Sequence, residues 1–360
     1  MQLFMNLPDE SQQLNQTQFP LKLHYHAPKG RFKIIHQGLM IPNLPAPLHY
    51  LNFISLIGQP NLPILRNVAA LHESALDTVT LMSSISPHMV GHLNDYSLEK
   101  ECIFSEGLFQ FGTREKITGY FPQFHLERHD AELSYDLEIY THPIVSHFSK
   151  LGLGLFEYWS LMCECQGQIR YQDQIFDIQQ LGTFEYARAI NVPYLPVHFF
   201  TYQIINLNQQ RQLLLVHIRN NFNQIVQSRL YLRDLIKGSA EMFDTDVHFK
   251  IHRVYPKVTT PNQQEMYLPR EFAWSWQQGE RSIIVYAQSR GDFKFGFAAG
   301  YAGSFKYQVT IDGVEEEGEA GYCEYIDCRP LRWQENNFQE KNLSELAYPS
   351  VFALKNKQNH

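Results

Sequence analysis

Glu185 stands out among the acidic residues because it lies between two aromatic side chains, Phe184 and Tyr186. An alternating segment precedes it, so we expect Glu185 near the end of a β-strand, where its side chain could face a cavity. Apolar surroundings raise the pKa of a carboxyl group, and aromatic faces attract cations. An acid in this setting could act as a proton donor near neutral pH.

A predicted hairpin leads to this acid. Within residues 157–166, Trp159, Leu161, Cys163 and Cys165 fall on one face and mostly polar residues on the other, which is typical of a half-buried strand. A tight connection at residues 171–174 returns the chain in the antiparallel direction. The sequence therefore predicts strand, turn and strand before Glu185.

Further strands are expected on both sides of this hairpin. The predicted segments are 78–85, 102–111, 116–127, 132–141, 211–219, 229–233, 247–253, 265–276, 281–287 and 301–311. Segment 211–219 is apolar on both faces, so it should be a central strand, and Asp312-Gly313 is a strong turn signal. Residues 49–58 are expected to form two helical turns that end at Gly58, because the surrounding prolines argue against a central strand. Residues 143–156 are expected to be a loop.

The composition limits the class of protein. A chain of 360 residues can form two domains, and 14% aromatic with 19% charged residues favours a folded, mostly β protein. A net charge of −7 argues against nucleic acid and anionic membranes as partners. The sequence shows neither a secretory signal nor a transmembrane segment, and its five cysteines fit reduced thiols. We therefore expect a cytoplasmic protein.

Two motifs carry a resemblance to a known family. Gly182-Thr183-Phe184-Glu185-Tyr186 and Gly321-Tyr322-Cys323-Glu324, with the spacing between them, resemble the motifs of the hydroxyneurosporene synthase, or carotenoid 1,2-hydratase, family. Residues 38–47 resemble an uncharacterised bacterial branch of that group. Thr183 stands where the family has tryptophan, Glu185 stands where it has aspartate, and its Trp-Glu-Gly is missing at residues 304–307.

The resemblance implies an all-β fold of two tandem lipocalin-like antiparallel β-barrels. We expect an irregular leader at residues 1–30, an N-terminal barrel at 31–192, a C-terminal barrel at 193–330 and a polar tail at 331–360. Residues 191–196, with two prolines, are the candidate linker.

A hydratase of this type needs an acid that protonates an alkene and aromatic faces that stabilise the resulting cation. Glu185 is the first candidate for that acid, Glu324 is the second, and His217 could position a water molecule. The candidate ligand-binding residues are Trp159, Phe184, Tyr186, Tyr202 and Trp274. The alternative is structural: Glu185 would pair with Arg188 or Arg219, and the aromatic residues would be core.

Three classes of function remain open. The protein could be a carrier or sensor that binds an apolar isoprenoid or fatty acyl molecule, a lyase or isomerase that needs no cofactor, or a scaffold with filled barrels. His24 and His26 could form half of a metal site, but no third ligand is indicated nearby, so we expect a solvated or capping role and no metal. The sequence does not indicate the oligomeric state.

Overall fold

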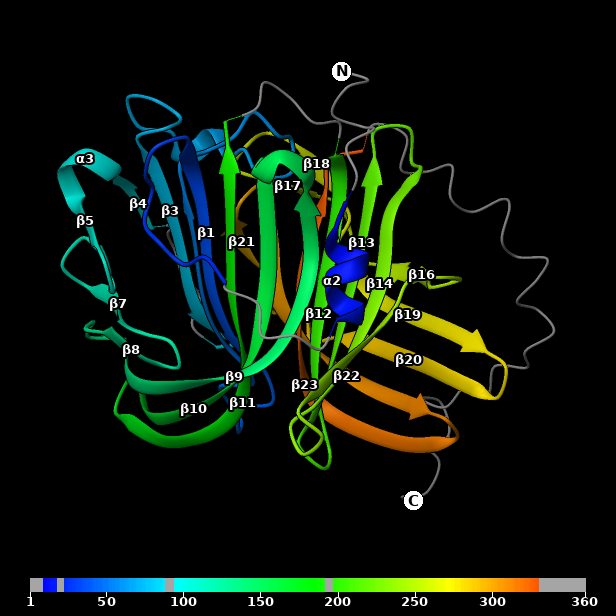
Figure 1. Ribbon diagram of the computed structural model, residues 1–360. Helices are drawn as coiled ribbons and strands as arrows, with labels where there is room; N and C mark the ends of the chain where they lie inside the picture. Colours follow the sequence, from blue (N-terminus) through cyan, green and yellow to red (C-terminus); the bar gives the residue numbers. More distant parts are fainter. Residues whose placement is uncertain (1–8, 18–22, 88–93, 192–196, 330–360) are drawn as a thin grey trace.

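The computed structural model describes residues 9–17, 23–87, 94–191 and 197–329. Nearly all of its regular structure is antiparallel β-sheet, arranged as two large curved sheets that lie side by side (Figure 1). This confirms the all-β fold with barrel-type sheets that the sequence predicts. The expected linker at 192–196 and the expected tail after 330 lie outside the described residues. Within the described part of the chain, none of the helices has the length and apolar composition needed to cross a membrane.

The first sheet is nearly closed into a barrel. In spatial order its strands are β4 (Asn94–Ser97), β3 (Thr78–Ile85), β2 (Leu51–Ile57), β1 (Phe32–Ile41), β11 (Gln174–Ile190), β10 (Phe156–Tyr171), β9 (Leu133–Leu151), β8 (Gln123–Arg128), β7 (Glu115–Tyr120), β6 (Leu108–Phe111) and β5 (Cys102–Ser105). The short helix α3 (Leu98–Glu101) joins β4 to β5, the two edge strands, so the edges of the sheet are connected directly in sequence.

The second sheet repeats the connections of the first. In spatial order its main strands are β15 (Ser239–Phe243), β14 (Ile225–Asp234), β13 (Arg211–Asn220), β12 (Val197–Leu207), β23 (Val314–Asp327), β22 (Gly300–Ile311), β20 (Arg281–Ser289), β19 (Pro269–Gln278) and β16 (His248–Val254). β21 (Lys294–Phe297) pairs with β22, and β17 (Val258–Thr259) pairs with β18 (Glu265–Met266). In each half the last strand, β11 or β23, pairs with the first strand, β1 or β12.

Period-two alternation assigns each side chain of a strand to one of two environments. In β10, Trp159, Leu161, Cys163 and Cys165 belong to the apolar cluster inside the first sheet, as the sequence predicts. Tyr158, Ser160 and Met162 point the other way and are covered by the second half of the molecule. The second face of β10 is therefore covered at these three positions, whereas Glu164 and Gln166, further along the same face, are exposed.

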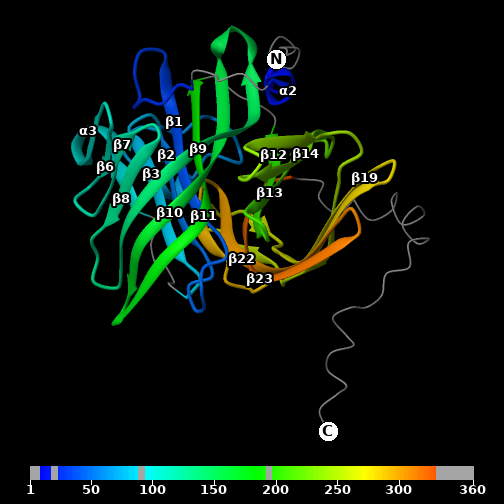
Figure 2. The ribbon, with the colours of Figure 1, turned by 60° about the horizontal axis from the view of Figure 1, so that its bottom comes forward.

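The outer face of the first sheet packs against the second sheet. Met40, Ile54 and Phe148 from the first sheet belong to the same apolar cluster as Tyr202 and Leu214 from the second. Figure 2 shows the two sheets as separate curved arcs that lie next to each other. This interface positions the candidate acids described below.

Two expectations from the sequence are wrong. Residues 49–58 do not form helical turns: Leu51–Ile57 is the strand β2, which lies between β1 and β3. Both of its faces are buried, so it has no polar side by which period two could be recognised. Residues 143–156 are not a loop, because β9 continues to Leu151 and pairs with β10 across an irregularity in register.

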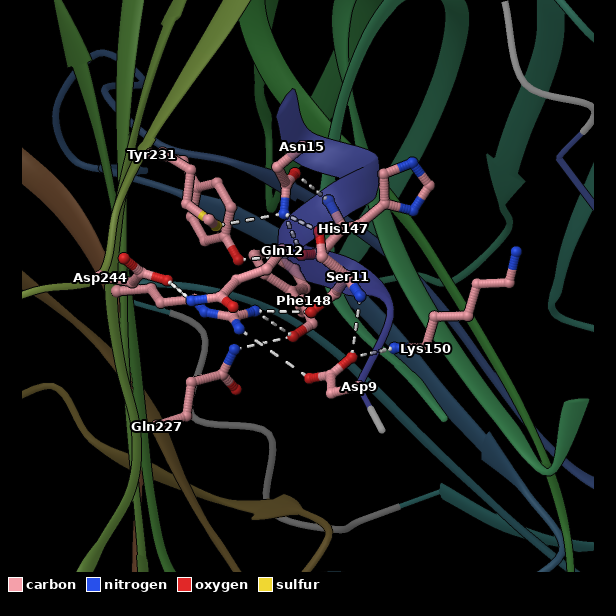
Figure 3. Close-up of polar contacts among 12 residues, drawn as sticks. Asp9, Ser11, Gln12, Asn15, His147, Phe148, Lys150, Gln227, Tyr231 and Asp244 are labelled. Atoms are coloured by element: carbon pink, nitrogen blue, oxygen red, sulfur yellow. Dashed lines mark hydrogen bonds and ion pairs between the residues drawn. The ribbon is translucent and has the colours of Figure 1, made fainter. Parts of the chain in front are cut away.

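The leader contains a helix that bridges the two sheets. The helix α2 (Ser11–Gln16) lies at the seam between them (Figures 1 and 2). Asn15 forms two hydrogen bonds with the backbone of His147 in β9: its Nδ2 donates to the carbonyl at 2.8 Å and its Oδ1 accepts from the amide at 2.9 Å. Ser11 accepts a hydrogen bond from Arg229 in β14 at 2.8 Å, and Arg229 also donates to the Phe148 carbonyl (Figure 3).

Candidate functional site

Glu185 lies inside the interface between the sheets. It occupies β11 opposite Gly38 of β1 and Ser160 of β10, and its exposed fraction is 1%. Phe184 and Tyr186 point into the first sheet, so the carboxyl group points away from them, toward the second sheet. The aromatic neighbours in sequence are therefore not its neighbours in space.

Two tyrosines hold the Glu185 carboxyl group. Tyr158 of β10 donates to Oε2 at 2.5 Å, and Tyr202 of β12 donates to Oε1 at 2.6 Å. The Nε2 of His36 lies 3.8 Å from Oε2. Burial, and next the negative charge of Glu185, raise the pKa of both tyrosines well above the usual value, so both keep their protons and donate them.

The ion pairs proposed as the structural alternative for Glu185 are wrong. Arg188 donates from Nε and Nη2 to Oε2 of Glu157, at 3.0 and 2.9 Å. Arg219 donates to His217 and Asn223 in the second half of the chain. Glu185 is buried without an arginine on either oxygen among the described contacts, which is an unusual setting for a carboxylate.

Glu324 is the second acid in this interface. It lies in β23 opposite Tyr202 and has an exposed fraction of 2%. Tyr322 donates to its Oε1 at 3.0 Å, and Asn52 of the first sheet donates to the Tyr322 oxygen at 3.2 Å. Burial, and next the charge of Glu185, raise the pKa of Glu324 well above its usual value. The interface thus holds two buried acids whose described hydrogen bonds come from tyrosine side chains.

The two acids occupy equivalent positions in a duplicated motif. Residues 182–186 and 321–325 share the pattern Gly-x-x-Glu-Tyr, and they lie in β11 and β23, the corresponding strands of the two halves. A Cβ atom at Gly321 would overlap the ring of Phe305, which explains the requirement for glycine there. Sequence reasoning treated both segments as candidate motifs but did not recognise them as copies of each other.

Three of the predicted ligand-binding residues lie together inside the first sheet. Trp159, Phe184 and Tyr186 are fully buried, and the ring centroids of Trp159 and Tyr186 are 5.5 Å apart. Phe121 extends this aromatic set, with its ring 5.9 Å from Trp159 and 6.2 Å from Phe184. The first sheet therefore encloses a cluster of aromatic rings separate from the two acids.

A row of buried polar side chains crosses the same interior. Gln37, Tyr186, Trp159 and His147 are consecutive neighbours on β1, β11, β10 and β9. Gln37 Oε1, Trp159 Nε1 and both ring nitrogens of His147 are buried and have no hydrogen-bond partner in the described part of the protein. Figure 3 shows the His147 imidazole pointing away from Asn15 and Ser11, which bind near its backbone. Burial, and next Lys150, lower the pKa of His147 to about 4, so its ring is neutral at pH 7.

Comparison with protein-family models assigns this chain to a family. A family of unknown function, DUF6670, matches residues 54–342. The chain belongs to the DUF6670 family. No curated protein matches the sequence.

Two solved structures show the same fold as this DUF6670 protein. A protein assigned as AttH from Nitrosomonas europaea has a TM-score of 0.55 and 13% identity, with 86% of this chain and 99% of that chain covered. Kievitone hydratase from Nectria haematococca has a TM-score of 0.51 and 8% identity, with 82% of this chain and 89% of that chain covered. These likenesses are consistent with the carotenoid hydratase-like fold that the sequence motifs indicated.

The last two predicted residues lie inside the second sheet of the DUF6670 fold. The rings of His217 and Trp274 are 6.1 Å apart. His217 contacts Ser228 Oγ at 3.0 Å and accepts from Arg219 at 2.7 Å, while Trp274 donates to Gln203 at 2.9 Å. The polar atoms here are paired, in contrast to those inside the first sheet. The predicted site residues therefore fall into three groups: the interface with Glu185, Glu324 and Tyr202, and the two sheet interiors.

A polar cleft lies elsewhere between the two halves of the DUF6670 fold. It has a volume of about 470 Å³ and is lined by residues such as Tyr140, Glu164, Gln180 and Asn206. None of the predicted site residues lines it. His24 and His26, considered above as half of a metal site, both contact the guanidinium group of Arg188, at 2.8 and 3.2 Å.

Proposed function

We propose that this DUF6670 protein binds a small molecule with an apolar body and one polar group inside its first sheet. The single observation that carries the proposal is the row of unpartnered polar atoms on Gln37, Trp159 and His147. Leaving a buried polar atom without a hydrogen bond costs about 1–3 kcal/mol, so native proteins rarely keep several in one place. A ligand that supplies the missing partners accounts for them.

The donors and acceptors in the row indicate which polar group the ligand carries. Trp159 Nε1 can only donate, Gln37 Oε1 can only accept, and neutral His147 has one donor and one acceptor nitrogen. A hydroxyl group both donates and accepts, so it suits this set better than a carboxylate, which only accepts. The surrounding rings of Trp159, Phe184 and Tyr186 suit an apolar body, such as an isoprenoid or acyl chain.

Native mass spectrometry of the purified protein, followed by extraction and identification of any bound molecule, tests this proposal directly. We expect a stoichiometric apolar molecule, or uptake of farnesol, hexadecanol or 2-naphthol by the empty protein with quenching of tryptophan fluorescence. If the protein contained no bound molecule and took up no probe, the proposal would be wrong. Buried water molecules would then be the hydrogen-bond partners of the row.

Acid catalysis without a cofactor is a second candidate function. The observation that favours it is the buried pair Glu185 and Glu324, whose described hydrogen bonds come from tyrosines. A protonated Glu324 could donate its proton to an alkene, as in a hydratase, isomerase or cyclase, and the tyrosine rings around it could stabilise a cation.

Incubation with isoprenoid alkenes in heavy-oxygen water, with mass spectrometry of the products, tests the second candidate. We expect a product that carries heavy oxygen if the reaction is hydration, or an unlabelled isomer or cyclised product if it is not, and loss of that product in Glu324→Gln and Glu185→Gln variants that still bind the substrate. Because glutamine keeps the size of the side chain, both variants should remain folded. Binding without conversion would reject catalysis and leave the binding function.

A further inference from the structure

A segment of the leader lies inside the first sheet, in the place where a ligand would bind. Residues 23–26 belong to no strand, and Leu23, Tyr25 and Ala27 pack against the interior cluster of the sheet. The ring of Tyr25 is surrounded by five aromatic rings. The centroid distances are 5.2 Å to Phe109, 5.8 Å to Phe121, 5.3 Å to Phe124, 5.5 Å to Phe184 and 5.3 Å to Tyr186.

The place of Tyr25 adjoins the unpartnered polar row. Tyr186 contacts the Tyr25 ring and is itself a member of the row, between Gln37 and Trp159. Phe121 contacts both the Tyr25 ring and Trp159. A molecule whose ring took the place of Tyr25 could therefore extend its polar group to Trp159 and His147.

Apart from these apolar contacts, the described polar contacts of the segment lie at its edge and involve side chains. Tyr186 donates to the carbonyl of His26 at 2.9 Å, and Arg188 contacts His24 and His26 while it pairs with Glu157. Segments held by few backbone hydrogen bonds open at low cost compared with the strands of a sheet. The leader can thus leave the interior while β10 and β11 remain paired.

We infer that the ligand carries an aryl ring with a hydroxyl group beyond it, and that this ring takes the place of Tyr25. The inference rests on the proposed binding function. The five surrounding rings meet Tyr25 in tilted or edge-on orientations, which are the favourable geometries for a flat six-membered ring. Exchange of one ring for another keeps these contacts. The ligand would also form hydrogen bonds with the unpartnered polar atoms, which Tyr25 does not form. These additional bonds favour the ligand over Tyr25.

The test compares three probes, 2-naphthol, farnesol and hexadecanol, on the full chain by fluorescence titration. In Tyr25→Ala the competing ring is absent, so 2-naphthol should bind at least about tenfold more tightly than it binds the unmodified protein. Tyr25→Phe keeps a ring in this place, so its affinity for 2-naphthol should stay within about threefold of that of the unmodified protein. Nitration by tetranitromethane, followed by mass spectrometry, should show that Tyr25 becomes more reactive when 2-naphthol saturates the unmodified protein, because its ring leaves the interior.

The outcomes separate this inference from the proposed function. Suppose that 2-naphthol binds the unmodified protein, that its affinity falls in His147→Phe, and that it binds Tyr25→Ala no more tightly. The proposed binding site would then be supported, and the inferred role of Tyr25 would be wrong. A preference of Tyr25→Ala for farnesol or hexadecanol over 2-naphthol would reject the aryl class. If no probe binds either protein, the proposed function itself fails. Thermal unfolding of Tyr25→Ala shows whether the variant is folded, and the nitration result on the unmodified protein does not depend on that variant.

Discussion

Trp159 and His147 lie directly opposite each other on β10 and β9, and neither side chain uses a ring nitrogen in a hydrogen bond within the described structure. Directly opposed side chains on one sheet face are close neighbours. With Gln37 they place three kinds of polar atom beside a cluster of aliphatic and aromatic side chains. This combination distinguishes the interior of the first sheet from that of the second, where Trp274 is paired with Gln203.

Removal of an unpartnered polar atom should stabilise the protein and weaken binding. We expect Gln37→Met to raise the free energy of unfolding by about 1 kcal/mol, because Oε1 loses no partner. The same change should weaken binding of a hydroxyl-bearing probe by about tenfold, the value of one hydrogen bond. Denaturant unfolding and fluorescence titration measure the two effects.

Gln203→Met is the matched control for that variant. Gln203 accepts from Trp274 and donates to Cys323, so its replacement breaks existing hydrogen bonds inside the second sheet. We expect it to lower the free energy of unfolding by about 1–3 kcal/mol and to leave probe affinity unchanged. Equal destabilisation by both variants would show that Gln37 has a partner after all.

His147 should make the protein less stable in mild acid. Its pKa is about 4 in the folded protein and 6.5 when unfolded, so the unfolded chain binds more protons between these values. Stability is therefore fully present above pH 6.5 and decreases as the pH falls toward 4, by up to about 3 kcal/mol, at about 1.4 kcal/mol per pKa unit. His147→Phe should reduce the slope in this range by about one proton. An unchanged slope in urea unfolding curves would contradict the assignment.

Glu324 should have the opposite effect on stability. Its pKa is raised in the folded protein, so the folded state holds the proton more tightly than the unfolded chain does. Its contribution to stability is complete below the unfolded pKa of about 4.3 and is lost as the pH rises through the folded value. Glu324→Gln stays neutral at every pH, so its stability relative to the unmodified protein should increase as the pH rises from 4 to 8. A constant difference over this range would mean that Glu324 titrates normally.

The hydrogen bond from Tyr202 to Glu185 should contribute more than an ordinary tyrosine hydrogen bond. Its acceptor is an oxygen of a fully buried carboxyl group, and leaving a buried acceptor without its donor costs about 1–3 kcal/mol. Tyr307 donates to the neutral carbonyl of Asn206, where about 1 kcal/mol is typical. We therefore expect Tyr202→Phe to destabilise the protein more than Tyr307→Phe does in equilibrium unfolding. Equal losses would contradict a larger contribution from the Tyr202 hydrogen bond.

The helix α2 should stabilise the interface through Asn15. Asn15→Ala removes both hydrogen bonds to the His147 backbone, which should cost about 1–3 kcal/mol. Gln13 lies exposed on the same helix, so Gln13→Ala should change stability by less than about 0.5 kcal/mol. Thermal unfolding of the two variants side by side measures the difference.

Period two predicted the strands where one face meets solvent. Leu133, Leu137 and Ile139 are buried and alternate with more exposed residues, as expected of β9. The rule failed at β2, where Phe53 faces the interior and Ile54 faces the second sheet, so both faces are apolar. Period-two alternation is visible only where one face of a strand is apolar and the other is polar. A strand that is buried on both faces shows no such difference.

The candidate site shows the same limit. Glu185 was recognised as an acid among aromatic residues, and it is buried, but its sequence neighbours point into another compartment. Adjacent residues of a strand face opposite sides, so Glu185 and Phe184 could not have shared a pocket. The partners of Glu185, Tyr158 and Tyr202, come from β10 and β12. Their meeting depends on the packing of two sheets, which no local pattern encodes.

The bonds of α2 join residues that are far apart in the order of synthesis. Asn15 binds His147, 132 positions later, and Ser11 binds Arg229, 218 positions later. The helix leaves the ribosome before either sheet, yet both of its docking partners are made only later. A six-residue helix is too short to be stable alone, so it must form late, on sheets that have already assembled. A segment that is translated before both sheets therefore folds after them.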